Sequence, residues 1–200
     1  MDAKKKIQKQ ICGSTWIVTT GLVALAVFVL TMAIFPPVAV MAMMVAFFFL
    51  LIGLLTSVPA MTRAKKYVKA LEEKGLLEKA AAELDGPTAK VIGKNKGVIT
   101  ENFLFGNKTG IVLPHSDILW TYKHKQTTTV LFVIPIMTVE SLMVCTAKKQ
   151  GMMVINLGGK DKKEELKDAI LTIYRSNPRT LVGYSQENQQ AYKQLRNTRV

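Results

Sequence analysis

The chain has 200 residues, a formal net charge of +13 and 49% hydrophobic residues. Its length suits one ordinary domain, or a smaller domain joined to something else, and the uneven spread of apolar residues favours the second arrangement. The two cysteines, Cys12 and Cys145, lie in different regions, which argues against a disulfide scaffold and a secreted protein and favours a reducing compartment.

The first part of the chain is basic and then uncharged. Residues 1–13 form a basic arm with four lysines, and residues 11–62 contain no Asp, Glu, Lys, Arg or His. A bilayer core of about 30 Å needs roughly 20 apolar residues in a helix. Residues 14–35 and 38–58 each supply such a run, and Pro36 and Pro37 between them break the helix. We therefore expect a two-helix transmembrane hairpin over residues 14–58. One overlong kinked helix and a buried hairpin of a soluble protein are the alternatives.

The flanking charges predict the orientation of this hairpin. Basic residues precede the first span and follow the second, whereas the turn between them has no charge: Arg63, Lys65, Lys66 and Lys69 come directly after residue 58. The positive-inside rule then places both ends of the chain in the cytoplasm. The sequence thus predicts a multi-pass protein of the cell membrane with cytoplasmic N- and C-termini.

Residues 62–86 read as a juxtamembrane connecting helix, with an imperfect apolar stripe and balanced charge on the other face. Asp85, Gly86 and Pro87 end it. An amphipathic helix lying on the bilayer surface is the alternative reading.

From residue 89 the pattern changes to short strands separated by turn residues. We expect strands near residues 90–93, 98–105, 111–113, 118–125, 127–134, 139–146 and 152–157, with a possible break at Glu101 and Asn102. Consecutive short strands of this kind are typical of an antiparallel barrel or sandwich. An α+β domain over residues 89–177 is therefore predicted.

The C-terminal part predicts one amphipathic helix followed by a polar segment. Asp161 and Glu164 have the spacing of a capping box, and a helix with an apolar face follows as far as Pro178. This helix is expected to cap one end of the sheet. Residues 178–200 are polar and form either a helix or a tail.

The stretch "ILWTYKHK", residues 118–125, combines aromatic and basic side chains in one predicted strand. Because alternate residues of a strand share a face, Trp120 and Tyr122 point one way with Ile118 and His124, and the lysines point the other way. Aromatic and basic groups on opposite faces do not suit stacking on nucleic-acid bases. The stretch therefore predicts a core strand, and no nucleic-acid partner.

The stretch "GVITENFLFGNKTGIVLPHSDILWTYKHK", residues 97–125, resembles bacterial pleckstrin-homology-like (PH-like) domains. Ile99-Thr100, Phe103-Leu104, Pro114, Asp117-Ile118, Trp120 and Tyr122 occupy the positions of that pattern. "VGYS", residues 182–185, is similar to a segment of small uncharacterised two-span membrane proteins of Gram-positive bacteria. The resemblance implies a PH-like antiparallel barrel or sandwich with a C-terminal capping helix, and almost no chemistry.

The sequence contains no pattern that predicts catalysis. His115 and His124 have no metal-ligand or nucleophile partner at a recognisable spacing, and the common phosphate-binding, hydrolase and metal motifs are missing. We therefore expect no catalytic residue, no metal site and no cofactor.

These observations favour a non-catalytic protein that is held by the bilayer through residues 14–58 and presents its cytoplasmic domain to a protein partner. The first alternative is recognition of an anionic lipid headgroup by basic loops and strand residues, with Lys94, Lys96, Lys123 and Lys125 as the candidate lipid-binding residues. The second alternative is an accessory subunit of a membrane transporter.

Overall fold

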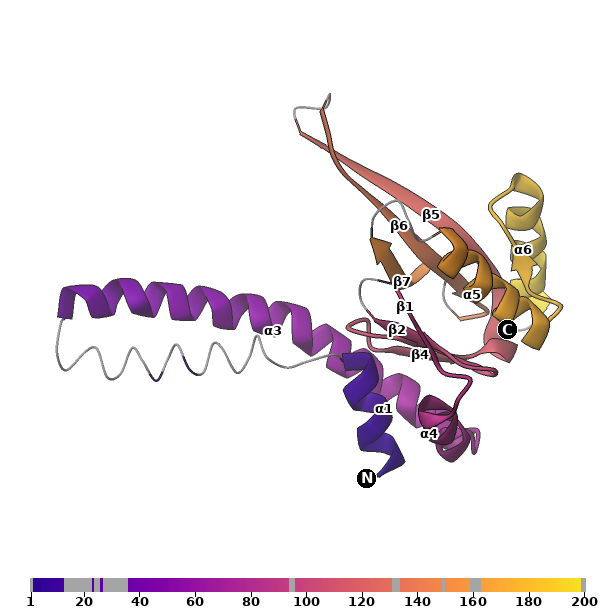
Figure 1. Cartoon of the computed structure of the whole chain (residues 1–200), viewed down its shortest axis with the longest axis horizontal. Helices are drawn as coiled ribbons and strands as arrows, with labels where there is room; N and C mark the ends of the chain where they lie inside the picture. The colour runs from indigo at the N-terminus through magenta and orange to yellow at the C-terminus, as the bar shows by residue number, and fades with distance from the viewer. Residues whose placement is uncertain are drawn as a thin grey trace.

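The computed structural model of the chain describes residues 2–12, 23, 26, 36–93, 96–130, 134–148, 150–158 and 163–198. Within these residues, helices lie around two four-stranded sheets (Figure 1). The helices are α1 (Ala3–Cys12), α3 (Pro36–Glu73), α4 (Leu77–Asp85), α5 (Lys163–Ser176) and α6 (Gln186–Thr198), with a short 3-10 helix η1 (His115–Asp117).

The first sheet is an antiparallel meander of β1 (Lys90–Ile92), β2 (Gly97–Ile99), β3 (Phe103–Gly106) and β4 (Ile111–Pro114), in that order. Its strands are short because turn residues follow each of them. The predicted break at Glu101 and Asn102 is confirmed: the chain reverses there, and the Thr100 N–H donates to the Phe103 carbonyl oxygen at 2.9 Å.

The second sheet has the order β7-β6-β5-β8 and consists of β5 (Ile118–Val130), β6 (Ile134–Thr146), β7 (Met152–Gly158) and β8 (Leu181–Val182). The strands β5, β6 and β7 are antiparallel neighbours, whereas β8 pairs with β5 in parallel. The far half of the β5–β6 hairpin extends away from the rest of the domain (Figure 1).

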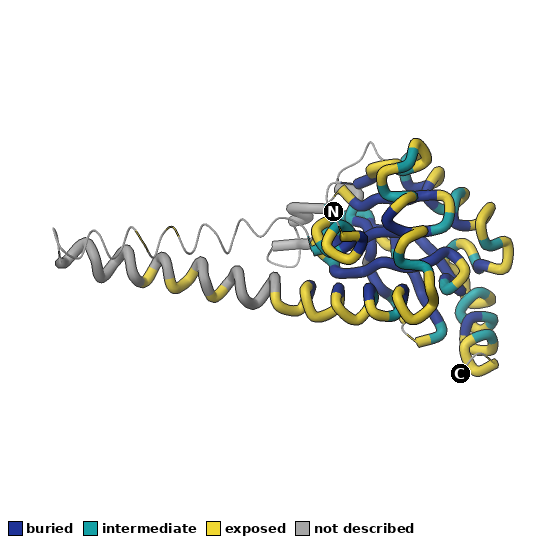
Figure 2. The backbone as a smooth tube through the Cα atoms, turned by 90° about the horizontal axis from the view of Figure 1, so that it is seen from below, coloured by how far each residue is buried: buried dark blue, intermediate teal, exposed yellow. Residues whose placement is uncertain are grey.

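Three groups of buried apolar residues form the core, and Figure 2 shows them as the dark segments of the tube. The first fills the space between the two sheets and α5, and includes Leu104, Leu142 and Ile173. The second joins α1, α3 and α4 to the first sheet. The third joins the second sheet to α6 through Trp120 and Tyr192.

Helix α1 belongs to the second of these groups, although its sequence reads as a basic arm. Ile7 and Ile11 are fully buried against α3, α4 and the first sheet. The N–H of Gly110 donates a 3.0 Å hydrogen bond to the Ile11 carbonyl oxygen. A Cβ atom at Gly110 would clash with the carbonyl of Ala60, and the backbone there has a φ of +68°, so glycine permits this close approach.

Among the described residues, no helix is both long and apolar enough to cross a membrane. This finding contradicts the predicted transmembrane hairpin over residues 14–58 and the predicted multi-pass location in the cell membrane. Pro36 and Pro37 do not form a turn: they begin α3, where a missing N–H is harmless. The helix then continues through Pro59 into charged residues and ends at Glu73. It therefore contains the second predicted span and only the first part of the predicted connecting helix over residues 62–86, and the rest of that segment forms the separate helix α4. Most of the first predicted span, residues 14–35, lies outside the described residues.

The predicted fold is a PH-like antiparallel barrel or sandwich, but the described strands do not close into a barrel. The strands form two separate sheets, and no pairing between the sheets occurs among the described residues. The edges of the first sheet are β1 and β4, and those of the second are β7 and β8. Sequence periodicity identifies strands but does not specify which edges pair, because pairing depends on contacts between distant parts of the chain.

Candidate functional site

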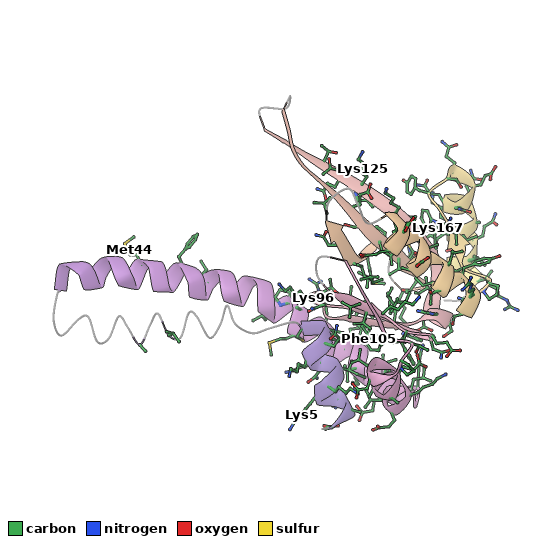
Figure 3. All side chains as sticks on the ribbon, in the orientation of Figure 1. Lys5, Met44, Lys96, Phe105, Lys125 and Lys167 are labelled. Atoms are coloured by element: carbon green, nitrogen blue, oxygen red, sulfur yellow. The ribbon has the colours of Figure 1, made fainter. Side chains whose placement is uncertain are left out.

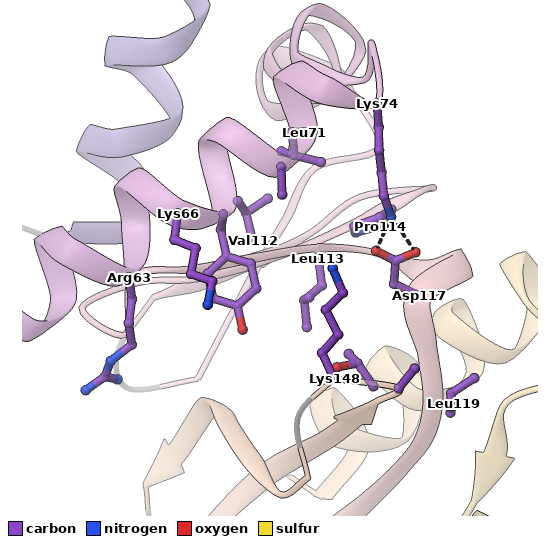
Figure 4. Close-up of a pocket in the computed structure, with 14 residues that line it drawn as sticks. Arg63, Lys66, Leu71, Lys74, Val112, Leu113, Pro114, Asp117, Leu119 and Lys148 are labelled. Carbon is purple, nitrogen blue, oxygen red and sulfur yellow. Dashed lines mark hydrogen bonds and ion pairs between the residues drawn. The ribbon is translucent and has the colours of Figure 1, made fainter. Parts of the chain in front are cut away.

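A pocket of about 440 Å³ opens between the C-terminal half of α3, strand β4, the start of β5 and the end of β6 (Figure 4). These elements come from three parts of the sequence. Helix α3 forms one wall, and the two sheets together form the opposite wall. The pocket therefore exists only once α3 has packed against the sheets.

The helix wall is one face of α3. Arg63, Lys66 and Ala70 follow one another at intervals of three and four residues, and so do Tyr67, Leu71 and Lys74, which is the spacing that places side chains on the same side of a helix. Lys74 directly follows Glu73, the last residue of α3. Leu71 is buried against the first sheet, whereas Arg63, Lys66 and Lys74 are exposed. The helix thus contributes an apolar floor with a row of positive charges.

The sheet wall is mainly apolar. Val112, Leu113 and Pro114 of β4 and Leu119 of β5 line it, together with Thr146, Ala147 and Lys148 at the end of β6. The amino group of Lys148 points into the pocket towards α3 (Figure 4). Lys148 is exposed. It lies opposite α3 because of the way the second sheet packs against the helix.

The charges around the pocket are not balanced. Lys74 forms an ion pair with Asp117, with distances of 2.6 and 2.8 Å from its amino group to the two carboxylate oxygens. Arg63 donates a hydrogen bond of 3.4 Å to the Thr109 carbonyl oxygen, a neutral acceptor. Among the described residues, neither Arg63 nor Lys66 nor Lys148 has a carboxylate partner. The pocket therefore carries an excess of positive charge beside apolar walls.

Tyr67 connects the pocket to the core. Its phenol lies 3.0 Å from the sulfur of Met152 in β7. Burial raises the pKa of Tyr67 above its ordinary value, and the positive charge of Arg63 opposes part of this rise. Tyr67 therefore stays a neutral donor that helps to hold α3 against the second sheet.

The candidates for catalysis do not come together. His115 is buried, with 1% of its surface exposed, and its ring nitrogens have no hydrogen-bond partner among the described residues. Burial lowers the pKa of His115 to about 4, and backbone groups of Glu101 and Phe103 and the charge of Glu83 only partly oppose this. His124 is exposed on β5, and Asp117 is paired with Lys74. Over the described part of the chain, no group of three His, Cys, Asp or Glu residues is arranged to hold a metal ion.

The lysines predicted to bind lipid headgroups are spread over the molecule. Lys94 lies outside the described residues. Lys96 is exposed in the turn between β1 and β2, whereas Lys123 and Lys125 lie on β5, and Figure 3 shows Lys96 and Lys125 well apart. Lys123 is paired with Glu140 at 2.5 Å. The structure brings Lys123 and Lys125 onto one strand, but it does not join them to Lys96 in a single site.

The pocket residues had a partial signal in the sequence. Arg63 and Lys66, which follow residue 58, have a spacing that places them on one side of a helix. The same residues are equally typical of the charged segment that flanks a membrane span. No local pattern indicates that Lys148 and Asp117 would lie opposite them. The juxtaposition depends on the tertiary fold.

A family model described as "Domain of unknown function (DUF6709)" matches residues 61–192, which includes every residue that lines the pocket. No curated protein and no solved structure matches the chain. The family description assigns neither a fold nor an activity, so the resemblance to bacterial PH-like domains stays a prediction.

Proposed function

The chain belongs to the family described as a domain of unknown function, DUF6709, and we propose that it is a non-catalytic binding domain for a protein partner. The partner's acidic segment occupies the pocket beside α3. One observation carries the proposal: Arg63, Lys66 and Lys148 surround the pocket without a carboxylate partner among the described residues.

Electrostatics supports an acidic ligand. Like charges held close together repel one another, and an opposite charge between them lowers the energy of the complex. Lys66 and Lys148 are exposed, so each ion pair with a ligand carboxylate contributes only about 0.2–1 kcal/mol. Several such contacts acting together favour a ligand with more than one acidic group.

The apolar walls support a protein segment over a lipid headgroup. A headgroup would use the exposed cations and leave the accessible apolar surfaces of Tyr67, Ala70 and Ala147 unused. A peptide that carries apolar side chains next to acidic ones uses both parts of the pocket. The volume of about 440 Å³ suits a few such side chains.

The proposal is tested with charge-reversed variants of the full chain. The variant with Lys66→Glu and Lys148→Glu changes two pocket residues. The control with Lys5→Glu and Lys65→Glu changes two exposed lysines outside the pocket and alters the net charge equally. The probe is a short fluorescent peptide in which glutamates flank a Leu-Phe pair, and its binding is followed by anisotropy at low and moderate salt.

We expect the pocket variant to bind the peptide at least about tenfold more weakly, because two ion pairs are replaced by repulsion. The control variant should bind like the unmodified chain, and added salt should weaken binding to the unmodified chain. Equal binding by both variants would contradict the proposal. If the chain does not bind the peptide but binds anionic vesicles, and the variant with Lys66→Glu and Lys148→Glu does not bind these vesicles, the lipid alternative would be favoured instead.

A further inference from the structure

Asp117 is the only carboxylate among the described residues that line the pocket. It lies at the end of η1, and both of its carboxylate oxygens contact the amino group of Lys74 (Figure 4). The pair lies on the pocket surface: 47% of the Lys74 side chain and 36% of the Asp117 side chain are exposed. Lys74 is thus the one pocket cation already occupied by an acidic group.

We propose that Asp117 stands in for a ligand carboxylate on Lys74, and that the pocket selects segments with acidic groups on both sides of their apolar residues. The inference rests on the proposed function. One acidic group of the ligand binds at Lys66 and Lys148, and the second replaces Asp117 on Lys74. Asp117 is then a specificity-determining residue that weakens the binding of this second group.

The exposure of the pair makes the exchange feasible. Ion pairs that are accessible to solvent contribute little net free energy, because water stabilises the separated charges almost as well. A ligand carboxylate therefore replaces Asp117 at little cost. The released Asp117 side chain returns to solvent without burying a charge.

The backbone around Asp117 is held by groups other than its carboxylate. The His115 N–H donates to the Asn102 carbonyl oxygen at 2.8 Å. The Asn177 side-chain amide donates to the carbonyl oxygens of His115 and Ile118, both at 3.0 Å. The Thr180 hydroxyl also donates to the Ile118 carbonyl at 3.0 Å. The η1 turn therefore keeps its shape when the carboxylate leaves Lys74.

The geometry of α3 sets the separation of the two acidic groups. Lys66 lies on α3, and Lys74 directly follows its last residue with its N–H still bonded to the Ala70 carbonyl oxygen at 3.3 Å. Eight helical positions correspond to about 12 Å along the axis. Tyr67 and Ala70, which are both partly exposed, lie between them on the same wall. An extended peptide covers this distance in about four residues. A short apolar stretch flanked by acidic residues on both sides matches the wall.

The test compares two peptides on the full chain. A one-sided peptide carries glutamates only before a Leu-Phe pair, and a two-sided peptide carries them before and after it. Asp117→Asn removes the competing charge, and Lys74→Met removes the second cation. Glu140→Gln is the matched control, because it also removes one negative charge and releases a lysine, Lys123, on β5 outside the pocket.

We expect Asp117→Asn to raise the affinity for the two-sided peptide about fivefold and that for the one-sided peptide less than about twofold. Lys74→Met should remove the preference for the two-sided peptide, and Glu140→Gln should change neither affinity. Equal effects of Asp117→Asn on both peptides, or no effect on either, would overturn the inference and leave the proposed function standing. Failure of both peptides to bind the unmodified chain would reject the proposed function itself.

Discussion

The phenol of Tyr192 donates a hydrogen bond of 2.9 Å to the backbone carbonyl oxygen of Thr146. Tyr192 belongs to α6 and is 1% exposed, and its ring packs against Trp120 at a centroid distance of 5.6 Å. Thr146 ends β6 and lines the pocket, directly before Ala147 and Lys148. Helix α6 therefore supports the pocket wall from behind.

Tyr192→Phe is expected to destabilise the domain by about 1–2 kcal/mol, because it removes a buried hydrogen bond while keeping the ring. Urea denaturation measures the change as a lower midpoint with an unchanged slope. Tyr174→Phe is the control, since 46% of Tyr174 is exposed. A stability equal to that of the unmodified chain would show that the hydrogen bond between Tyr192 and Thr146 does not stabilise the domain.

The docking of α6 could only partly be predicted from the sequence. The segment of residues 178–200 is rich in Gln, Asn and charged residues, and it reads as either a helix or a tail. A single buried aromatic residue, Tyr192, gives too weak a periodic pattern to separate the two readings. Its partner Thr146 lies far away in the sequence, so the contact that stabilises the helix has no local signal.

Glu83 is expected to be important for stability because it connects α4 to the turn between β2 and β3. It accepts hydrogen bonds from the Thr100 hydroxyl at 2.7 Å and from the backbone and side-chain amides of Asn102 at 3.0 and 2.6 Å. Burial favours a higher pKa for Glu83, but these hydrogen bonds and the charge of Lys79 lower its pKa below the ordinary value of 4.5.

Glu83→Gln should therefore lower the free energy of unfolding at neutral pH by about 1–2 kcal/mol, because hydrogen bonds to a charged acceptor become neutral ones. A carboxylate with a lowered folded pKa stabilises the fold above its unfolded pKa, and this contribution is lost as the pH falls through the folded value. The variant and the unmodified chain should then converge in acid. Glu73→Gln is the control, since 64% of the Glu73 side chain is exposed in its pair with Lys69. An equal loss in both variants would contradict the role of Glu83.

His115 should make the domain sensitive to mild acid. Its pKa is lowered from 6.5 to about 4 in the folded chain, so the unfolded chain binds the proton more readily between these values. The stability is complete above pH 6.5 and falls as the pH drops towards 4, by about 3 kcal/mol in total. The measurement is urea denaturation at a series of pH values.

His115→Leu removes the titrating group and keeps an apolar side chain in the buried position. The difference in stability between this variant and the unmodified chain should then shift in favour of the variant as the pH falls from 6.5 to 4. Carboxylates that titrate in the same range affect both proteins equally and cancel in the difference. A difference that stays constant with pH would show that His115 is not the group responsible.

The strand β5 shows where periodicity succeeds and where it fails. Trp120 and Tyr122 are buried, as the alternation predicts, and Lys125 is exposed. However, Leu119 and Thr121 are buried too, and His124 is exposed. The first half of β5 has both faces covered, and a register shift lies between Ile118 and Trp120. Alternation of apolar and polar residues predicts burial correctly for a strand with one face in solvent. It does not indicate that elements distant in the sequence cover the other face as well.

Ile7→Ala tests whether α1 is part of the folded domain, although the family match begins only at residue 61. Ile7 is fully buried, so its truncation should cost about 3 kcal/mol. Lys5→Ala, at an exposed position on the same helix, should leave the stability unchanged. A small loss for Ile7→Ala, similar to that of the control, would indicate that α1 does not contribute to the stability of the domain.

The bond between the Gly110 N–H and the Ile11 carbonyl has a consequence for the order of folding. The ribosome makes α1 before the first sheet, but the surface that covers Ile7 and Ile11 includes Phe105 and Val112 of that sheet. Contacts between such distant segments form slowly, because a long loop must close before they contribute. The apolar face of α1 therefore lacks part of its cover until the first sheet has been made, and apolar surface exposed in this way favours aggregation of the nascent chain over that interval.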